Sequence, residues 1–142
     1  MKKNSLLLLA FVMICSISIA QKNKKIVVPA AARSAFEKKY PEATNVLWEK
    51  EKSIYEANWG GTSGEDHSAQ FTPSGKFVEI IDAIAISDLP KSVSAYVATH
   101  YKSAKITEAG KVTDASGKQT YEAEVNGKDL IFDVNGKFLK KE

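Results

Sequence analysis

The sequence predicts an α+β fold of two tandem repeats, repeat 1 over residues 28–86 and repeat 2 over residues 87–142. Each repeat is expected to be one helix followed by about four antiparallel strands, with the helices packed on one face of the sheet. Three observations support this prediction. The second half of the chain resembles the first, each half opens with apolar residues at helical spacing, and alternating segments with hairpin signals follow each helix.

The repeat appears when the chain is shifted by 61 positions. The segment "VPAAARSAFEKKYPEA" (28–43) then aligns with "LPKSVSAYVATHYKSA" (89–104), and "FTPSGKFVEI" (71–80) aligns with "FDVNGKFLKK" (132–141). Loops of different length separate the aligned segments, as expected for two copies of one supersecondary unit.

The chain begins with the pattern of a secretory signal peptide, which we place at residues 1–20, with cleavage after Ala20 and a mature N-terminal tail over residues 21–27. Its apolar run is shorter than the roughly 20 residues that cross a membrane, so no stable membrane insertion is expected after cleavage. Cys15, the only cysteine, follows the bulky Ile14, which disfavours a lipoprotein. We therefore expect a periplasmic or secreted protein without disulfides.

The charge of the mature chain is close to neutral. Removing the leader leaves 18 basic residues against 17 acidic ones, a formal net charge of +1. Because no strong positive field remains, neither nucleic acid nor an anionic membrane surface is predicted as a partner. Roughly 120 residues are enough for a core that buries about two-thirds of the extended-chain surface.

Each repeat opens with one apolar helical face. In repeat 1 the face consists of Val28, Ala32, Ala35, Phe36 and Tyr40, and in repeat 2 of Leu89, Val93, Tyr96, Val97 and Tyr101. Pro41 is expected to end the first helix, since proline cannot continue the hydrogen-bond pattern.

The strands that follow are marked by alternation, as in "SIYEANW" (53–59) and "TYEAEV" (120–125), and by turn signals. The dipeptides Asn126-Gly127 and Asn135-Gly136 predict two-residue hairpin turns. The apolar segment "VEIIDAIAISDLP" (78–90) joins the halves without a linker. Either one continuous sheet or two abutting sheets would fit.

Two-residue turns fix which side chains share a face of the sheet. The face beneath the helix is expected to collect Tyr121, Ala123, Val125, Leu130, Phe132, Val134 and Leu139. The opposite face is expected to be polar with scattered apolar anchors, which is how protein interfaces are composed. The candidate partner-binding residues on it are Glu56, Asn58, Phe77, Glu122, Ile131 and Phe138, with Trp48 assignable to either face. Single exposed apolar residues are also common without any function.

Groups with catalytic or metal-binding potential are scarce. His67 lies beside Ser63, Glu65 and Asp66, but neighbours on one loop rarely converge, and a metal site wants three or four convergent ligands. The nearby glycines match neither a P-loop nor a dinucleotide fingerprint. We therefore predict no enzymatic activity, no cofactor and no metal. A hydrolase centred on His67 is the least favoured hypothesis.

The order of the segments "AFEKKYPEA", "LWEK", "YEANW", "SGKF", "ISDLP", "YEAEV" and "LIFDVNGKFL" resembles the β-lactamase-inhibitor-like, PepSY-like family of exported bacterial proteins. The resemblance covers essentially the whole mature chain. It implies two tandem units of helix and antiparallel sheet, a periplasmic or secreted location, and no established activity. The disulfides of the β-lactamase inhibitor itself have no counterpart here.

The leading functional prediction is a non-enzymatic exported binding module that docks a protein partner on its open sheet face, as an inhibitor or as a folding or envelope accessory. The alternative is a small apolar ligand held between the helices and the sheet, or in the seam between the two copies, in a pocket lined by residues such as Phe36, Tyr55, Trp59 and Tyr96. The sequence leaves the partner and the oligomeric state open.

Overall fold

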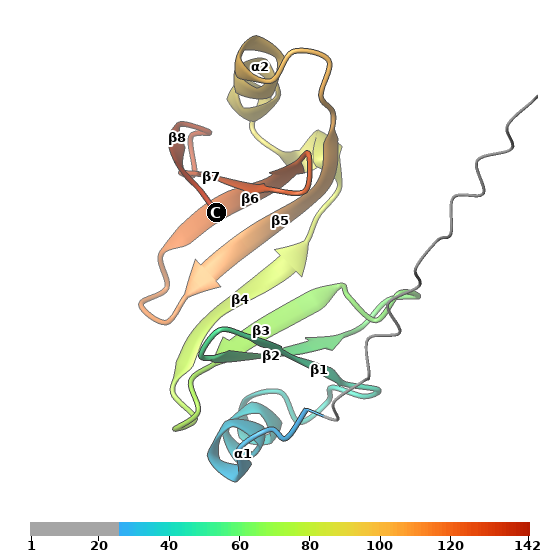
Figure 1. Ribbon diagram of the computed structural model, residues 1–142, viewed down its shortest axis with the longest axis vertical. Coiled ribbons are helices and arrows are strands. Elements are labelled where there is room, and N and C mark those ends of the chain that lie inside the picture. The colour runs from blue at the N-terminus through green and yellow to red at the C-terminus, as the bar shows by residue number, and fades with distance from the viewer. Residues whose placement is uncertain (1–25) are drawn as a thin grey trace, which may run out of the picture.

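The structure is a computed structural model, and it describes residues 26–142. The predicted signal peptide and most of the predicted tail lie outside the described residues. Figure 1 shows the order of the elements along the chain. They are α1 (Ala30–Lys39), β1 (Leu47–Glu51), β2 (Ile54–Trp59), β3 (His67–Phe71), β4 (Phe77–Ala83), the 3₁₀ helix η1 (Ile86–Asp88), α2 (Lys91–His100), β5 (Ile106–Asp114), β6 (Gln119–Val125), β7 (Asp129–Phe132) and β8 (Phe138–Lys141).

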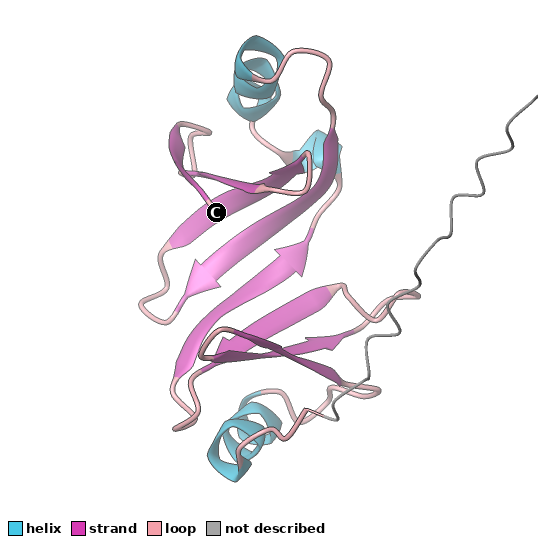
Figure 2. Ribbon diagram, viewed as in Figure 1, coloured by secondary structure: helices cyan, strands magenta, loops and turns pink. Residues whose placement is uncertain are grey.

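The eight strands form one antiparallel sheet in chain order, β1 to β8. Strand β4 pairs with β5 in the register Ile81↔Val112, so the two halves share a continuous sheet rather than two abutting ones. The two helices lie at opposite ends of the long axis, with the twisted sheet between them (Figure 2). Two helices with an antiparallel sheet confirm the predicted α+β class.

Both helices begin directly after a proline and end directly before a tyrosine. Pro29 and Pro90 occupy the N-cap positions with φ of −56° and −52°, close to the value at which a helix starts. At the other ends, the backbone N–H groups of Tyr40 and Tyr101 donate to the carbonyl oxygens four residues earlier. The predicted helical segments are therefore confirmed. No helix in the described part of the chain is long and apolar enough to cross a membrane.

The first hydrophobic cluster is organised around Phe36 of α1. Its ring centroid lies 5.3 Å from that of Trp48, 5.1 Å from that of Trp59 and 6.1 Å from that of Phe71, each in an edge-on arrangement that aromatic pairs favour. These partners come from β1, β2 and β3. Trp48, which the sequence left unassigned, therefore lies on the side of the sheet that contacts α1.

The second cluster is organised around Tyr96 of α2. Its ring stacks on Phe138 at 4.7 Å and meets Phe132 edge-on at 5.5 Å. Phe132 and Leu130 of β7 are fully buried in the same cluster, together with Val93 of α2. Strands β6 to β8 thus meet α2 through one continuous apolar layer.

Three hairpins share one turn geometry, at residues 72–76, 114–118 and 133–137. In each, the first residue's N–H donates to the carbonyl of the fifth residue, and the fourth residue's N–H donates back to the first residue's carbonyl. The fourth residue is glycine in all three, with φ between +77° and +83°. A side-chain oxygen of the first residue accepts further backbone N–H groups. This is a three-residue loop in which the glycine forms a bulge.

That geometry corrects one predicted turn. Asn126 and Gly127 both have positive φ, 55° and 67°, so the first predicted two-residue turn is confirmed. At the second dipeptide, Asn135-Gly136, only Gly136 has a positive φ, and the loop contains one residue more than a two-residue turn. Phe138 consequently pairs with Phe132, whereas the predicted register paired Phe132 with Leu139.

The predicted placement of Phe77 and Phe138 on the open face is therefore wrong. A change of one residue in register moves the side chain to the other face of the sheet. Phe138 stacks on Tyr96 of α2, and Phe77 meets Phe71 at 5.6 Å in the cluster around α1.

Candidate functional site

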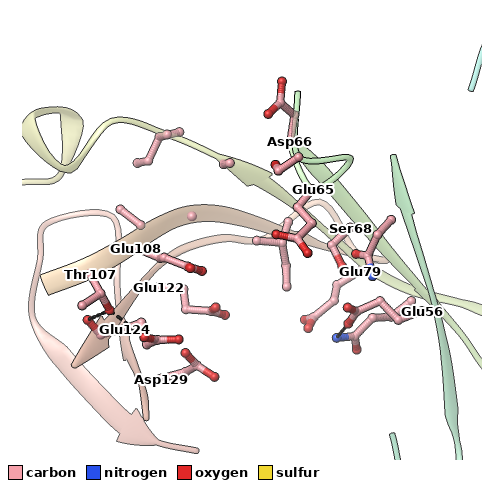
Figure 3. Close-up of a pocket in the computed structure, with 18 of the residues that line it drawn as sticks. Glu56, Glu65, Asp66, Ser68, Glu79, Thr107, Glu108, Glu122, Glu124 and Asp129 are labelled. Atoms are coloured by element: carbon pink, nitrogen blue, oxygen red, sulfur yellow. Dashed lines mark hydrogen bonds between the residues drawn. The ribbon is translucent and has the colours of Figure 1, made fainter. Parts of the chain in front are cut away.

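The sheet face opposite the two helix clusters forms a hollow of about 810 Å³. Strands from both halves contribute to it, so neither half could form it alone (Figure 3). We call this feature the acidic hollow. Its lining consists of Glu49, Glu51, Glu56, Asn58, Ser63, Glu65, Asp66, Ser68, Gln70, Glu79, Ile81, Ala83, Ile84, Ala85, Ile86, Thr107, Glu108, Ala109, Gly110, Glu122, Glu124, Asp129 and Glu142.

The lining carries charge of a single sign. Eleven of the 17 acidic residues of the chain line the hollow, and no lysine, arginine or histidine does so. The lining is therefore uniformly acidic, although Lys140 of β8 lies on the same face of the sheet and pairs with the lining residue Glu142. A concave surface of one sign focuses the electrostatic potential and raises the local concentration of oppositely charged groups.

Carboxylates lie directly opposite each other on neighbouring strands. Glu49 pairs with Glu56 across β1 and β2, and Glu124 pairs with Asp129 across β6 and β7. Like charges at such positions destabilise a sheet. Two hydrogen bonds offset part of this cost: Gln70 Nε2 donates to Glu56 Oε2 at 3.0 Å, and the Thr107 hydroxyl donates to Glu124 Oε1 at 2.6 Å.

Glu122 lies in the middle of β6 and is the most perturbed carboxyl group of the hollow. Burial and then the negative charges of Asp129, Glu79, Glu142 and Glu56 raise its pKa to about 7. Burial is also the first cause of the raised pKa values of Glu79 and Asp129. The hollow therefore carries more negative charge than its surroundings stabilise.

One polar atom of the lining, the Ser68 hydroxyl oxygen, is buried without a hydrogen-bond partner among residues 26–142, and Asn58 beside it is almost fully buried. Asn58 is only 8% exposed, and Ser68 lies opposite it in the register of β2 and β3. Unsatisfied buried polar groups are uncommon in proteins because each carries a desolvation cost. The Ser68 hydroxyl lies on the hollow, where a bound molecule could supply the missing hydrogen bond.

The seven predicted face residues divide between the two sides of the sheet. Glu56, Asn58 and Glu122 line the acidic hollow. Ile131 lies opposite Glu122 in the register, but it is only 7% exposed and does not line the hollow, so it is not the exposed apolar residue that was predicted. Trp48, Phe77 and Phe138 pack in the hydrophobic clusters on the other side.

Sequence reasoning missed the scale of the acidic surface. Glu49, Glu51, Glu65, Glu108 and Glu142 come from widely separated segments and meet only in the folded sheet. The spacing of Glu49 and Glu51 in "WEKEK" is a local signal that both point to one face of a strand. No local signal connects them with Glu108.

His67 lies outside this surface. Its Nδ1 is 2.8 Å from Asp82 Oδ1, and its ring packs 5.3 Å from that of Trp59 on the side of the helix clusters. Among residues 26–142, no group of three or more His, Cys, Asp or Glu side chains could hold a metal ion.

A smaller hollow of about 240 Å³ lies between α1 and β1. Of the four aromatic residues predicted to line a ligand pocket between helices and sheet, Phe36 is the only one among its lining residues. Trp59 contacts Phe36, and Tyr96 contacts Phe132 and Phe138, so these rings fill the layer between helix and sheet.

The described chain combines two helices with one eight-stranded antiparallel sheet, which makes it a small α+β protein. The chain belongs to the family described as "Putative beta-lactamase-inhibitor-like, PepSY-like", whose family model matches residues 59–140.

Several solved structures share the fold. A DUF2874 family protein from Bacteroides ovatus is 21% identical with a TM-score of 0.64, and 82% of this chain and 88% of that one are covered. A protein from Bacteroides eggerthii, described as "putative periplasmic", is 20% identical with a TM-score of 0.66, covering 82% and 89%. A BLIP-like protein from Bacteroides fragilis is 22% identical with a TM-score of 0.60, covering 83% and 88%. No curated protein matches the chain.

Proposed function

We propose that this protein is a non-enzymatic exported binding module, periplasmic or secreted, that docks a protein partner on the open face of its sheet. The leader-like N-terminus supports export, as do the family and the "putative periplasmic" description of the Bacteroides eggerthii structure. Inhibition of an enzyme is one form that such docking could take, in line with the BLIP-like description of another similar structure.

The observation that carries the proposal is the acidic hollow itself. It occupies the face opposite both hydrophobic clusters, and residues from both halves line it. Its buried Ser68 hydroxyl has hydrogen-bonding capacity that the described chain leaves unused. Stability alone does not favour such a surface, because the facing carboxylates repel each other.

We further propose that the hollow arose by duplication of one unit of helix and four strands, with residues 28–86 and 87–142 as the copies. The order of elements after α1 is repeated after α2. Buried Ala32 and Phe36 of α1 correspond at the 61-residue shift to buried Val93 and Val97 of α2. The turns at 72–76 and 133–137 correspond in the same way, with the same hydrogen bonds.

Site-specific photo-crosslinking tests the docking face. Glu108 is exposed and lines the hollow, whereas Lys91 is exposed at the start of α2 and does not line it. Each residue is replaced in turn by benzoylphenylalanine, and the protein is produced in the bacterium from which its gene comes. After irradiation, crosslinked species are separated by size and identified by mass spectrometry.

We expect one protein to crosslink at position 108 and not at position 91. Equal crosslinking from both positions would mean that contacts are random. No protein crosslink from position 108 would contradict docking on this face. Circular dichroism of both purified variants controls for folding.

A further inference from the structure

The acidic hollow concentrates negative charge far beyond what the composition requires. The mature chain is nearly neutral, yet eleven of its 17 acidic residues line one concave face that has no basic residue in its lining. Basic residues are as numerous as acidic ones in the mature chain and could have been interspersed. Their exclusion from the lining is therefore a specific property of this face.

We propose that the segment which docks in the hollow is basic, a loop or helix of a partner protein that carries several lysine or arginine side chains. This inference rests on the proposed function and specifies the chemistry of the partner. A cationic segment relieves the repulsion between facing carboxylates, and arginine can bind a carboxylate through two parallel hydrogen bonds.

The arrangement of the carboxylates favours a polypeptide over a single ion. They come from β1, β2, β4, β5, β6 and β7, and Figure 3 shows Glu108, Glu122 and Asp129 on one side of the space with Glu56 and Glu79 on the other. No three of the metal-ligating side chains in residues 26–142 converge closely enough to hold a metal ion. Distributed charges match a segment whose cations are themselves spread along a chain.

An independent feature also indicates an occupant. The Ser68 hydroxyl oxygen, buried in the lining of the hollow, has no hydrogen-bond partner in the described chain, and Asn58, more than nine-tenths buried, lies opposite it. A bound backbone offers both N–H donors and C=O acceptors, which a hydroxyl can use. A simple cation could satisfy only its oxygen atom.

The raised pKa of Glu122 is consistent with a site that a positively charged group of the partner would occupy. Its pKa is raised to about 7 by burial and by Asp129, Glu79, Glu142 and Glu56. Lys140 of β8 lies opposite Ile131 on this face, but its ammonium group is itself paired with Glu142. A bound cation would favour the ionised form of Glu122, so binding should release protons and weaken as the pH falls.

A peptide-binding assay tests the partner chemistry. The probe is a fluorescein-labelled peptide of about 12 residues with alternating lysine and serine, long enough to cross a sheet of this size, and its control replaces every lysine by glutamate. Binding to the purified mature protein is followed by fluorescence anisotropy at low salt and at about 150 mM salt. We expect saturable binding of the lysine peptide, which weakens with salt, and none of the glutamate peptide.

Two charge-matched variants locate the binding. The hollow variant carries Glu56→Gln, Glu122→Gln and Asp129→Asn. The control carries Glu37→Gln, Glu42→Gln and Asp88→Asn, three exposed acidic residues outside the hollow. We expect the hollow variant to bind the lysine peptide about tenfold or more weakly and the control to change less than about twofold. Similar losses in both variants would overturn the inference, because attraction would then depend only on net charge.

The remaining outcomes separate the inference from the proposed function. If the photo-crosslinked partner segment carries no cluster of lysine or arginine, docking on this face stands and the basic partner is wrong. If Ca²⁺ or spermine binds the hollow while the lysine peptide does not, the partner class is also wrong. Concentration-dependent self-association that the hollow variant abolishes would identify a second copy as the occupant and overturn the inference.

Discussion

Neutralising Glu122 should stabilise the protein, and the gain should depend on pH. In the folded chain its pKa is about 7 rather than the ordinary 4.5. At 1.36 kcal/mol for each pKa unit, this difference corresponds to about 3 kcal/mol of folding free energy. The value is an upper limit, because the hollow is open to solvent, which screens the neighbouring charges.

The direction in which stability changes with pH follows from proton binding to Glu122. Between pH 4.5 and about 7 the folded protein holds the Glu122 proton more tightly than the unfolded chain does. The contribution of this group to stability is therefore fully present below pH 4.5 and is lost as the pH rises through about 7. The raised pKa values of Glu79 and Asp129 act in the same direction.

Urea denaturation of the mature wild type and of Glu122→Gln over this pH range tests the reasoning. We expect Glu122→Gln to be more stable by up to about 3 kcal/mol at pH 8 and by almost nothing at pH 4, because glutamine resembles the protonated carboxyl group. The exposed Glu37→Gln serves as the control and should show neither effect. A gain for Glu122→Gln that stays the same from pH 4 to pH 8 would refute the assigned titration.

Further predictions concern the second half of the chain and are measured by the same denaturation assay. Phe138→Ala should lower the free energy of unfolding by about 3 kcal/mol, because the Phe138 ring stacks on Tyr96 of α2. Leu139 is 46% exposed, so Leu139→Ala should lower it by less than about 0.5 kcal/mol. A larger loss for Leu139→Ala than for Phe138→Ala would instead support the two-residue turn. Gly136 and Gly117 both have positive φ, but a Cβ atom at Gly136 would clash with the side chains of Pro90 and Ser92, whereas Gly117 faces open space. Gly136→Ala should therefore lower the free energy of unfolding more than Gly117→Ala. Equal losses would refute the contact between Gly136 and the α2 segment. Asp133→Ala should cost about 1 to 2 kcal/mol, since its carboxylate accepts two backbone N–H groups of the turn at 2.9 Å, and an unchanged midpoint would contradict this.

The helices and the face of β6 and β7 could be predicted because local rules govern them. Periodicity identified the buried positions of α1 and α2, and the turn at Asn126-Gly127 fixed the pairing of Glu122 with Ile131. Asn135-Gly136 contains the same two residue types, yet Asp133 changes the outcome. Its carboxylate accepts the N–H groups of Asn135 and Lys137, which favours the longer loop.

The prediction that Phe77 and Phe138 lie on the open face of the sheet was wrong for that reason. Phe77 and Phe138 each follow one of the three-residue loops, so the bulge turns them toward the helices. The recurring order of Thr or Asp, then Ser or Asn, then Gly and Lys at 72–76, 114–118 and 133–137 was visible in the sequence and would have indicated the correct turn.

The sequence by itself determined the helices, the order of strands and the alternation that places Glu56 and Glu122 on one face, because these depend on residues close together in the chain. Only the tertiary structure decided that β4 pairs with β5 and that this face is hollow. Carboxylates from β1 to β7 meet there because strand pairing and twist bring distant segments together. A residue pattern along the chain describes one strand at a time, whereas the electrostatic potential of the hollow is the sum of the carboxylate charges from all the strands that line it.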